Sequence, residues 1–403
     1  MNNFGTLYRF ELKKLMQRKL LWVSLLICLV VCGFSVFSAL IGKHYVDGKL
    51  YDTYYHMFQV DQGYSRALSG RAIDQQLLEE TFAAYGKIPP EAERYQITQE
   101  YQTYARPYSP IMNYTRNYLG GGSLEEVMLW KVDEADLYAS RLNTLEDLWS
   151  RNRLSETEKN FWRQQEAKIE KPVVYVHSPG YNQMVDCLST VAVLALLFIS
   201  IGMAGVFFEE HTRRTDQLTL STANGKVRLY WAKLLAGTTV AGGGTLLMML
   251  TVAGLSLGIY GAEGSHAALQ LYFWVSSYPL TVLQACLIGY GIVLLIAVFF
   301  GVFVMVLSEA LRSNIGALSI SVGLVVLGGM VTMPEGNRLL AQIWDYLPMC
   351  FLVIWNLFDI RLVTVFGRCM TSWQFVPVCY MLAVVLLVLA GKRVYQRYQV
   401  SGR

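Results

Sequence analysis

The chain has 403 residues, of which 54% are hydrophobic and only 16% are charged. About 25% charged residues is usual for soluble proteins, so this composition excludes an ordinary soluble protein. The apolar residues fall in uncharged blocks of about 20 or more, the length that crosses about 30 Å of hydrocarbon. The formal net charge of +4 is small and lies beside these blocks, which indicates topology signals and lipid contacts and argues against a nucleic-acid partner. We expect an all-α polytopic membrane protein.

The first 42 residues predict an interfacial helix followed by a membrane span. Residues 1–19 place Phe4, Leu7, Tyr8, Leu12 and Leu15 on one helical face, as in an amphipathic helix lying at the cytoplasmic surface. Residues 20–42 are too long for a signal-peptide core and lack a clear cleavage site. We therefore expect a retained first transmembrane helix.

Residues 43–183 change to a polar, tyrosine-rich composition and predict a large extracytoplasmic domain. Apolar residues recur at helical spacing up to Tyr85, before a stop at Gly86. The pairs Ser123 with Glu126 and Ser155 with Glu158 have the spacing of capping boxes, so each predicts a helix start. No run alternates well enough for a sheet, and we expect a mostly helical domain.

Residues 184–403 predict transmembrane helices 2 to 6. The expected spans are 187–208, 234–260, 280–306, 315–333 and 373–391. Segment 339–358 is also apolar, but Asp345 and Pro348 interrupt it, and a full crossing there would place Lys392 and Arg393 outside, against the positive-inside rule. We interpret it as an outer re-entrant pair of short helices, which gives six spans and two cytoplasmic termini.

The sequence predicts no catalytic, cofactor or metal site on this chain. Gly225-Lys226 lacks the surrounding residues of a phosphate-binding loop, so any ATP and Mg must bind another chain. The odd number of cysteines, seven, does not suggest a disulfide framework, although Cys350 and Cys369 have the option of pairing if both lie outside. Ionisable groups are nearly absent from the spans, which disfavours a proton-coupled transporter.

The charged stretch from Phe207 to Lys233 carries a family resemblance. It has Glu209 or Glu210 at the end of a span, then Leu220-Ser221-Thr222, then Lys226 seven positions before Lys233. This pattern resembles the first cytoplasmic loop of bacterial type-2 ATP-binding-cassette (ABC) exporter permeases, although Ala223 stands where that family often has Pro. The resemblance implies a coupling helix that docks on a separate ABC ATPase subunit, in the bacterial plasma membrane.

The coupling loop 209–233 supplies the residues expected to contact the ATPase. An apolar side chain such as Leu218 suits a buried anchor, with charges around it as a polar rim. The alternative is a loop that contacts only lipid head groups. The expected coupling residues are Glu209, Glu210, Asp216, Leu218, Leu220, Lys226, Arg228 and Lys233.

The resemblance further implies two permease halves around a shared path. We expect the chain to pair with a second copy or a similar permease through small residues, because helices in lipid associate by close packing. Packing within one subunit is the alternative. The glycines expected at this contact are Gly202, Gly205, Gly316 and Gly323.

Two functions remain open at this point. The first is an exporter permease, for which the family implies lipids, antimicrobial peptides, drugs or ions as substrates. The second is a non-transporting receptor or scaffold that presents residues 43–183 outside the cell. Four further spans with short loops favour a translocation path.

Overall fold

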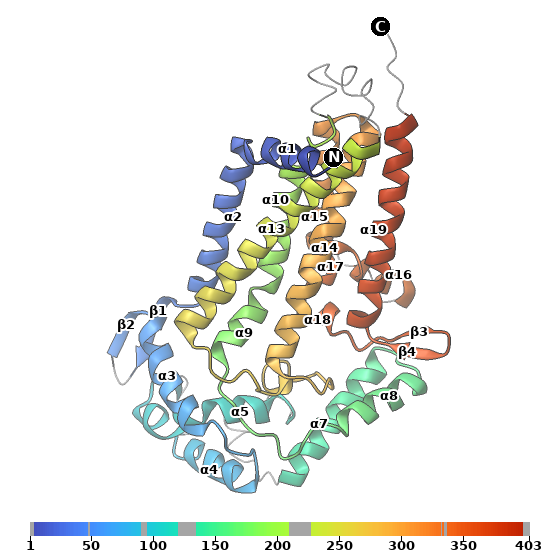
Figure 1. Ribbon diagram of the computed structural model, residues 1–403. Helices are drawn as coiled ribbons and strands as arrows, with labels where there is room; N and C mark the ends of the chain where they lie inside the picture. Colours follow the sequence, from blue (N-terminus) through green and yellow to red (C-terminus); the bar gives the residue numbers. More distant parts are fainter. Residues whose placement is uncertain are drawn as a thin grey trace.

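The computed structural model describes residues 4–46, 49–89, 95–119, 134–208, 227–331, 333 and 337–397. Long helices form a bundle, and a group of shorter helices covers one end of it (Figure 1). Helix α1 and the last residues of α19 lie at the opposite end. We call the two ends the domain end and the terminal end.

Four described helices are long and apolar enough to cross a membrane, and a bent pair makes up to five. The bent pair, α9 and α10, changes direction by 41°. A further apolar helix, α15, has 17 residues. The four long helices are α2 (Lys19–Ser38), α13 (Val227–Tyr260), α14 (Val282–Leu311) and α19 (Ser372–Arg397); the others are α1 (Phe4–Met16), α9 (Pro179–Asp186), α10 (Leu188–Met203) and α15 (Asn314–Met330).

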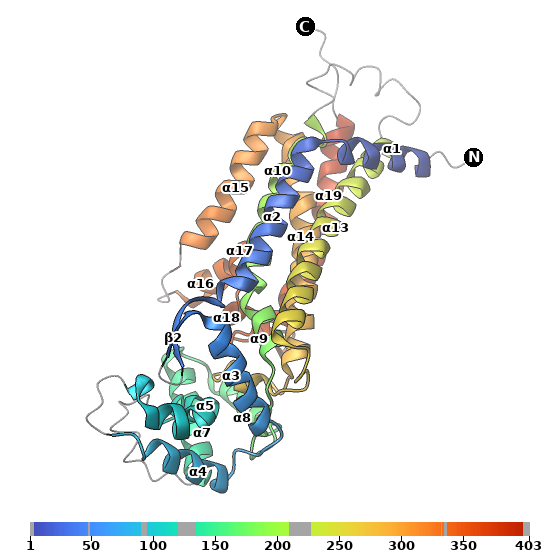
Figure 2. The same cartoon turned by 90° about the vertical axis from the view of Figure 1, so that its left-hand side faces the viewer.

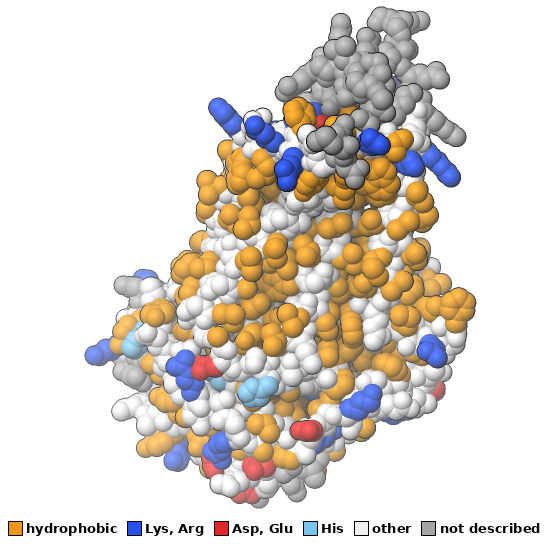
Figure 3. Space-filling model, viewed as in Figure 1, with side chains coloured by type: hydrophobic (Ala, Val, Ile, Leu, Met, Phe, Trp, Pro, Cys, Tyr) orange, Lys and Arg blue, Asp and Glu red, His pale blue; other side chains and the backbone are white. Residues whose placement is uncertain are grey.

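Helix α14 lies at the centre of the bundle and packs against α10, α13, α15 and α19. Helix α2 contacts α10 and α13, whereas α15 lies at the edge of the bundle (Figure 2). On the face shown in Figure 3, hydrophobic side chains cover the middle of the bundle, and Lys and Arg side chains gather near the terminal end. This distribution is what a lipid environment requires, because uncharged surface can face hydrocarbon and basic groups can face lipid phosphates.

Glycines in α13 let neighbouring helices approach closely. A Cβ atom at Gly244 would lie 2.3 Å from the ring of Phe198 on α10, and one at Gly237 would lie 2.3 Å from the sulfur of Met305 on α14. By contrast, Gly254 and Gly258 have open space where a Cβ would lie. Close packing in α13 therefore depends on two glycines, one facing α10 and one facing α14.

The shorter elements at the domain end come mostly from residues 41–166. Ser155 caps α8 with a capping box formed with Glu158, as predicted. A short antiparallel hairpin was not expected, and its strands are β1 and β2. The elements are β1 (Ile41–Val46), β2 (Lys49–Thr53), α3 (Tyr54–Leu68), α4 (Gln75–Tyr85), η1 (Tyr95–Ile97), η2 (Tyr101–Ala105), η3 (Arg106–Tyr108), α5 (Ser109–Arg116), α7 (Glu134–Arg151) and α8 (Glu156–Glu166). The capping box predicted at Ser123 lies outside the described residues.

A buried arginine fastens these helices to the connection between α13 and α14. Arg141 on α7 is 1% exposed and pairs with Glu166 of α8 at 2.9 Å. The same guanidinium donates to the carbonyls of Trp274 at 2.8 Å and Ser276 at 2.9 Å. A buried charge with this many partners holds its geometry, because losing any partner would leave a polar group unpaired.

The segment after α15 is broken into short pieces. Helix α16 ends at Asp345 and α17 begins at Pro348, the two residues expected to interrupt this apolar stretch. A second short hairpin, which the sequence did not predict, precedes α19. The elements are α16 (Arg338–Asp345), α17 (Pro348–Phe351), α18 (Ile354–Leu357), β3 (Val363–Val365) and β4 (Arg368–Met370), and a 3-10 turn, η4 (Leu269–Leu271), lies between α13 and α14.

Candidate functional site

The candidate site lies at the terminal end, where α13 begins after the coupling loop. Two of the eight expected coupling residues are described, Arg228 and Lys233, and both lie in the first two turns of α13. The interval interpreted as a loop up to Lys233 is thus helical from Val227 onward. The remaining six, Glu209, Glu210, Asp216, Leu218, Leu220 and Lys226, lie outside the described residues.

Lys233 is completely buried, with 0% of its surface exposed. Its Nζ donates to the carbonyl oxygen of Val206 at 3.2 Å and lies 3.7 Å from Oε2 of Glu11. The ammonium group also lies 5.7 Å from the ring centre of Phe207. A buried ammonium needs such partners, because an uncompensated charge in a low-dielectric interior is strongly unfavourable. Lys233 therefore joins the start of α13 to the end of the bent span and to α1.

Helix α1 supplies the acidic partner. Glu11 is 4% exposed and is also 3.9 Å from Lys14, one turn further along α1. A second contact between α1 and α13 joins Tyr8 Oη to Thr239 Oγ1 at 3.0 Å. Glu11 was not among the residues predicted from the sequence. The available signal was its position, three residues after Tyr8 and four before Leu15, which places a carboxylate on the apolar face of α1.

Three further side chains hold the helix ends around the loop. Arg18 donates to the carbonyls of Gly202 and Gly205 at 3.4 and 3.2 Å, which links the start of α2 to the end of the bent span. Tyr230 donates to the carbonyl of Val388 at 2.7 Å and so links α13 to α19. The hydroxyl of Ser308 on α14 donates to the carbonyl of Ala204. Both chain ends that lead into the loop are thus fixed to neighbouring helices.

The four glycines expected at a permease contact have different surroundings. A Cβ at Gly202 would lie 2.8 Å from Leu21, and one at Gly205 would lie 3.5 Å from Arg18, so both face α2 of the same chain. Gly316 faces Ser313, which caps its own helix. Gly323 has open space at its Cβ position. Of the four, Gly323 alone has no neighbour within 4 Å among the described residues.

The described cysteines and potential metal ligands form neither a disulfide nor a cluster that suits a metal ion in this structure. Among the described residues, no group of three or more His, Cys, Asp or Glu side chains has a geometry that suits a metal ion. Cys350 and Cys369 are free thiols, like the other five cysteines. The described residues of the candidate site join the helix ends on either side of segment 209–226 through a buried ion pair and backbone contacts.

The long apolar helices packed around α14 define a polytopic helical membrane protein. The sequence matches the family model described as ABC-2 family transporter protein over residues 18–391. The chain belongs to that family, which confirms the resemblance to type-2 ABC permeases. The family is the membrane component of a transporter and is not itself catalytic. No curated protein matches the chain closely enough to count as a relative.

Proposed function

We propose that this chain is the membrane-spanning permease subunit of an ABC exporter. Six spans are α2, the bent pair α9 and α10, α13, α14, α15 and α19. The basic residues near the terminal end, such as Arg18, Lys392 and Arg393, support a cytoplasmic placement of both termini in a bacterial plasma membrane. Residues 43–183 then form an extracytoplasmic domain. We expect the transported substrate to be an antimicrobial peptide, a lipid or a drug.

The buried contact between Lys233 and Glu11 carries this proposal. A loop that receives force from a partner needs rigid attachments, since a freely hinged loop would move without moving the spans. Lys233 attaches α13 to α1 at 3.7 Å, and Arg18 attaches the end of the bent span to α2 at 3.2 Å. Movement of the coupling loop by a separate ATPase, which holds ATP and Mg, therefore reaches several spans together.

Replacing Leu218 by Asp tests the coupling. A charge at an apolar anchor prevents its burial in a partner cleft, so Leu218→Asp should abolish co-purification of the ATPase subunit while the permease still inserts in the membrane. Ser401→Asp is the matched control, because it adds the same charge in the basic tail, and it should leave association unchanged. Unchanged association in Leu218→Asp removes the loop from the interface. Tagged wild-type protein that carries no ATPase favours the receptor or scaffold alternative.

We further propose that two permease copies, or this chain and a similar permease, assemble. The support comes from α15, where Gly323 is open and the neighbouring Ile320 and Leu327 are 44% and 55% exposed. Because Gly202 already packs against Leu21 of its own chain, a single cysteine at Gly323 should crosslink between copies and one at Gly202 should not. A monomeric permease in the purified ATPase complex contradicts the pairing.

A further inference from the structure

A cavity of about 570 Å³ lies at the domain end, between the α7–α8 corner and the α16–α18 segment. Its volume falls within the range of about 300–1,000 Å³ typical of small-molecule sites. The walls come from parts of the chain that are far apart in sequence, including Leu148 on α7, Phe273 before α14, and Trp355 on α18. The family match does not assign any role to this cavity.

The lining of the cavity is positively charged. Four arginines line it, Arg151, Arg153, Arg338 and Arg361, against two carboxylates, Asp345 and Asp359. Glu158 lies outside the lining but pairs with Arg338. With Glu158 included, four arginines face three carboxylates, and the net charge is +1. An anion is therefore the ligand class that this lining attracts.

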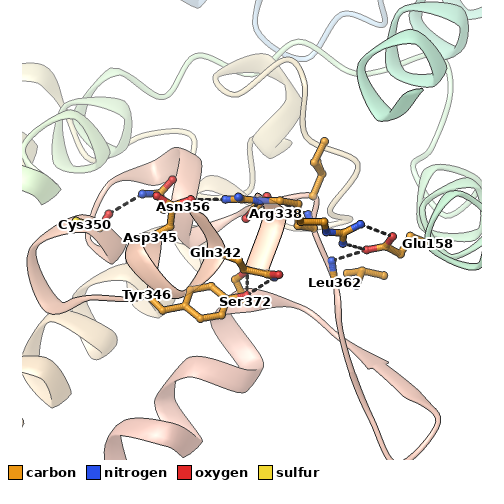
Figure 4. Close-up of polar contacts among 12 residues, drawn as sticks. Glu158, Arg338, Gln342, Asp345, Tyr346, Cys350, Asn356, Leu362 and Ser372 are labelled. Carbon is orange, nitrogen blue, oxygen red and sulfur yellow. Dashed lines mark hydrogen bonds and ion pairs between the residues drawn. The ribbon is translucent and has the colours of Figure 1, made fainter. Parts of the chain in front are cut away.

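Two of the arginines are held by carboxylates and two are not. Arg361 bridges Asp345 at 2.5 Å and Asp359 at 2.6 Å, and Arg338 reaches from α16 to Glu158 (Figure 4). Arg151 and Arg153 are exposed, and in the described part of the chain neither side chain makes an ion pair. The first pair builds the wall of the cavity, and the second pair has guanidinium groups available for a ligand.

Arg153 is held in a left-handed backbone conformation, with a φ of 52°. It follows the end of α7, a position where glycine is usual because glycine adopts this conformation without steric strain. The carbonyl of Arg153 also accepts a hydrogen bond from Arg338 at 3.4 Å.

Helix α16 forms one side of the cavity and has an amphipathic pattern. Helix α16 turns Arg338, Ala341 and Asp345 toward the cavity, while Leu339 and Ile343 on its other side are 72% and 63% exposed. Such a short amphipathic helix suits the boundary between head groups and hydrocarbon. In Figure 1, α16 lies beside α19, and the long helix α14 extends further toward the domain end than α16 does.

Two aromatic rings form an apolar wall of the cavity, and hydrogen bonds fix the backbone segment beside it. Trp355 is 57% exposed, and its ring packs edge-on against Phe273 with centroids 4.6 Å apart. The backbone of residues 360–362 is fixed by two hydrogen bonds. Trp162 Nε1 donates to the carbonyl of Ile360 at 2.7 Å. Glu158 accepts from the backbone N–H of Leu362 at 3.0 Å (Figure 4). The cavity therefore combines two exposed arginines, an aromatic wall and a hydrogen-bonded backbone segment, which together fit an anionic amphiphile.

We propose that this cavity binds the phosphate head group of an anionic lipid from the leaflet at the domain end, with Arg151 and Arg153 contacting the phosphate. Guanidinium groups bind phosphate oxygens through paired, charge-assisted hydrogen bonds. The Phe273 and Trp355 rings cover the glycerol and the first acyl carbons. This site does not depend on the proposed transport function, since it requires neither an ATPase nor turnover.

Binding of short-chain lipids to the purified full-length chain in neutral detergent tests the site by calorimetry. Dioctanoyl phosphatidylglycerol should bind, and the Arg151→Gln/Arg153→Gln double variant should weaken that binding by tenfold or more. Its control, Arg368→Gln/Lys168→Gln, removes two exposed cations outside the cavity lining and should change the affinity less than twofold. Equal loss in both double variants would show general charge attraction and overturn the site.

Ligand chemistry separates the remaining outcomes. Dioctanoyl phosphatidylcholine, which has no net charge, should bind at least tenfold more weakly than dioctanoyl phosphatidylglycerol. Inorganic phosphate should compete poorly, because it cannot use the aromatic wall. Tight binding of inorganic phosphate would make this a free-anion site, and tighter binding of an acidic peptide than of the lipid would make it a peptide site; either result overturns the lipid assignment.

Discussion

At the scale of single residues, Lys233 shows how one buried charge organises the loop base. Its partners are Glu11 and the carbonyl of Val206, which come from different helices. Removing one partner of a buried pair leaves the other charge uncompensated and typically lowers the free energy of unfolding by about 3–5 kcal/mol. Lys233→Ala should therefore markedly lower the melting temperature in detergent. Lys13→Ala, on the exposed face of α1, should shift stability by less than about 0.5 kcal/mol.

A double variant separates charge from packing at this position. If the unpaired carboxylate is the cause, Glu11→Gln combined with Lys233→Met should recover much of the stability that Lys233→Ala loses, because neither charge remains. A melting temperature for the double variant below that of Lys233→Ala would contradict the ion-pair explanation.

Asp359 gives the cavity a pH-dependent charge. Burial raises the pKa of this carboxyl to about 6, although Arg361 partly opposes the rise and Asp345 adds to it. In the unfolded chain the Asp359 carboxyl has a pKa of about 3.9, so the folded state binds its proton more tightly. The contribution of Asp359 to the free energy of unfolding should therefore fall by up to about 3 kcal/mol as pH rises from about 4 to 6.

Thermal unfolding across pH 4 to 7 measures this dependence against Asp359→Asn. The melting temperature of the wild type relative to the variant should decrease as pH rises through this window and level off above about pH 7. Titrating groups that do not interact with Asp359 are common to both proteins and cancel. Parallel curves for the two proteins would refute the assignment to Asp359.

At the scale of elements, packing between α13 and α10 depends on Gly244. A methyl group there would meet the ring of Phe198, which is 1% exposed and has little room to move. Gly244→Ala should lower stability by about 1–3 kcal/mol through overpacking. Gly254→Ala in the same helix has open space and better helix propensity, so its melting temperature should stay equal or rise. A neutral Gly244→Ala would show that α10 and α13 separate easily.

The elements themselves were largely predictable, since a block of uncharged residues must become a helix in lipid. The start of α8 followed from Ser155 and Glu158, and the break in segment 339–358 followed from Asp345 and Pro348. The two hairpins were missed, because strands of three to six residues give little alternation to detect.

The sites were less predictable, because their residues meet only after folding. Lys233 was interpreted as a basic loop residue, and only the structure shows its burial beside Glu11, which is more than 200 positions away in the sequence. The arginines of the cavity likewise come from α7, α16 and the segment before β3. Sequence spacing carries no information about contacts of this kind unless a local motif encodes them.

At the scale of the whole molecule, the membrane topology is testable by labelling. On a cysteine-free background, an impermeant thiol reagent applied to intact cells should label a cysteine placed at Ser69 or Asn337. It should miss a cysteine at Ser221 or Ser401, because the basic residues near these positions favour the cytoplasmic side. Labelling of Ser401 from outside would mean that segment 339–358 crosses the membrane and that the six-span arrangement is wrong.

Helix α13 has 34 residues and is therefore about 51 Å long, well beyond the roughly 30 Å of hydrocarbon. One end is fastened at Lys233 near the coupling loop, and the other accepts a hydrogen bond from Gln62 of α3 at the carbonyl of Tyr260, at 2.8 Å. Because the helix is rigid and has contacts at both ends, a tilt at one end moves the other end as well. A tilt of only about 5° would displace one end by roughly 4 Å relative to the other, enough to shift the domain-end helices without any span changing its length.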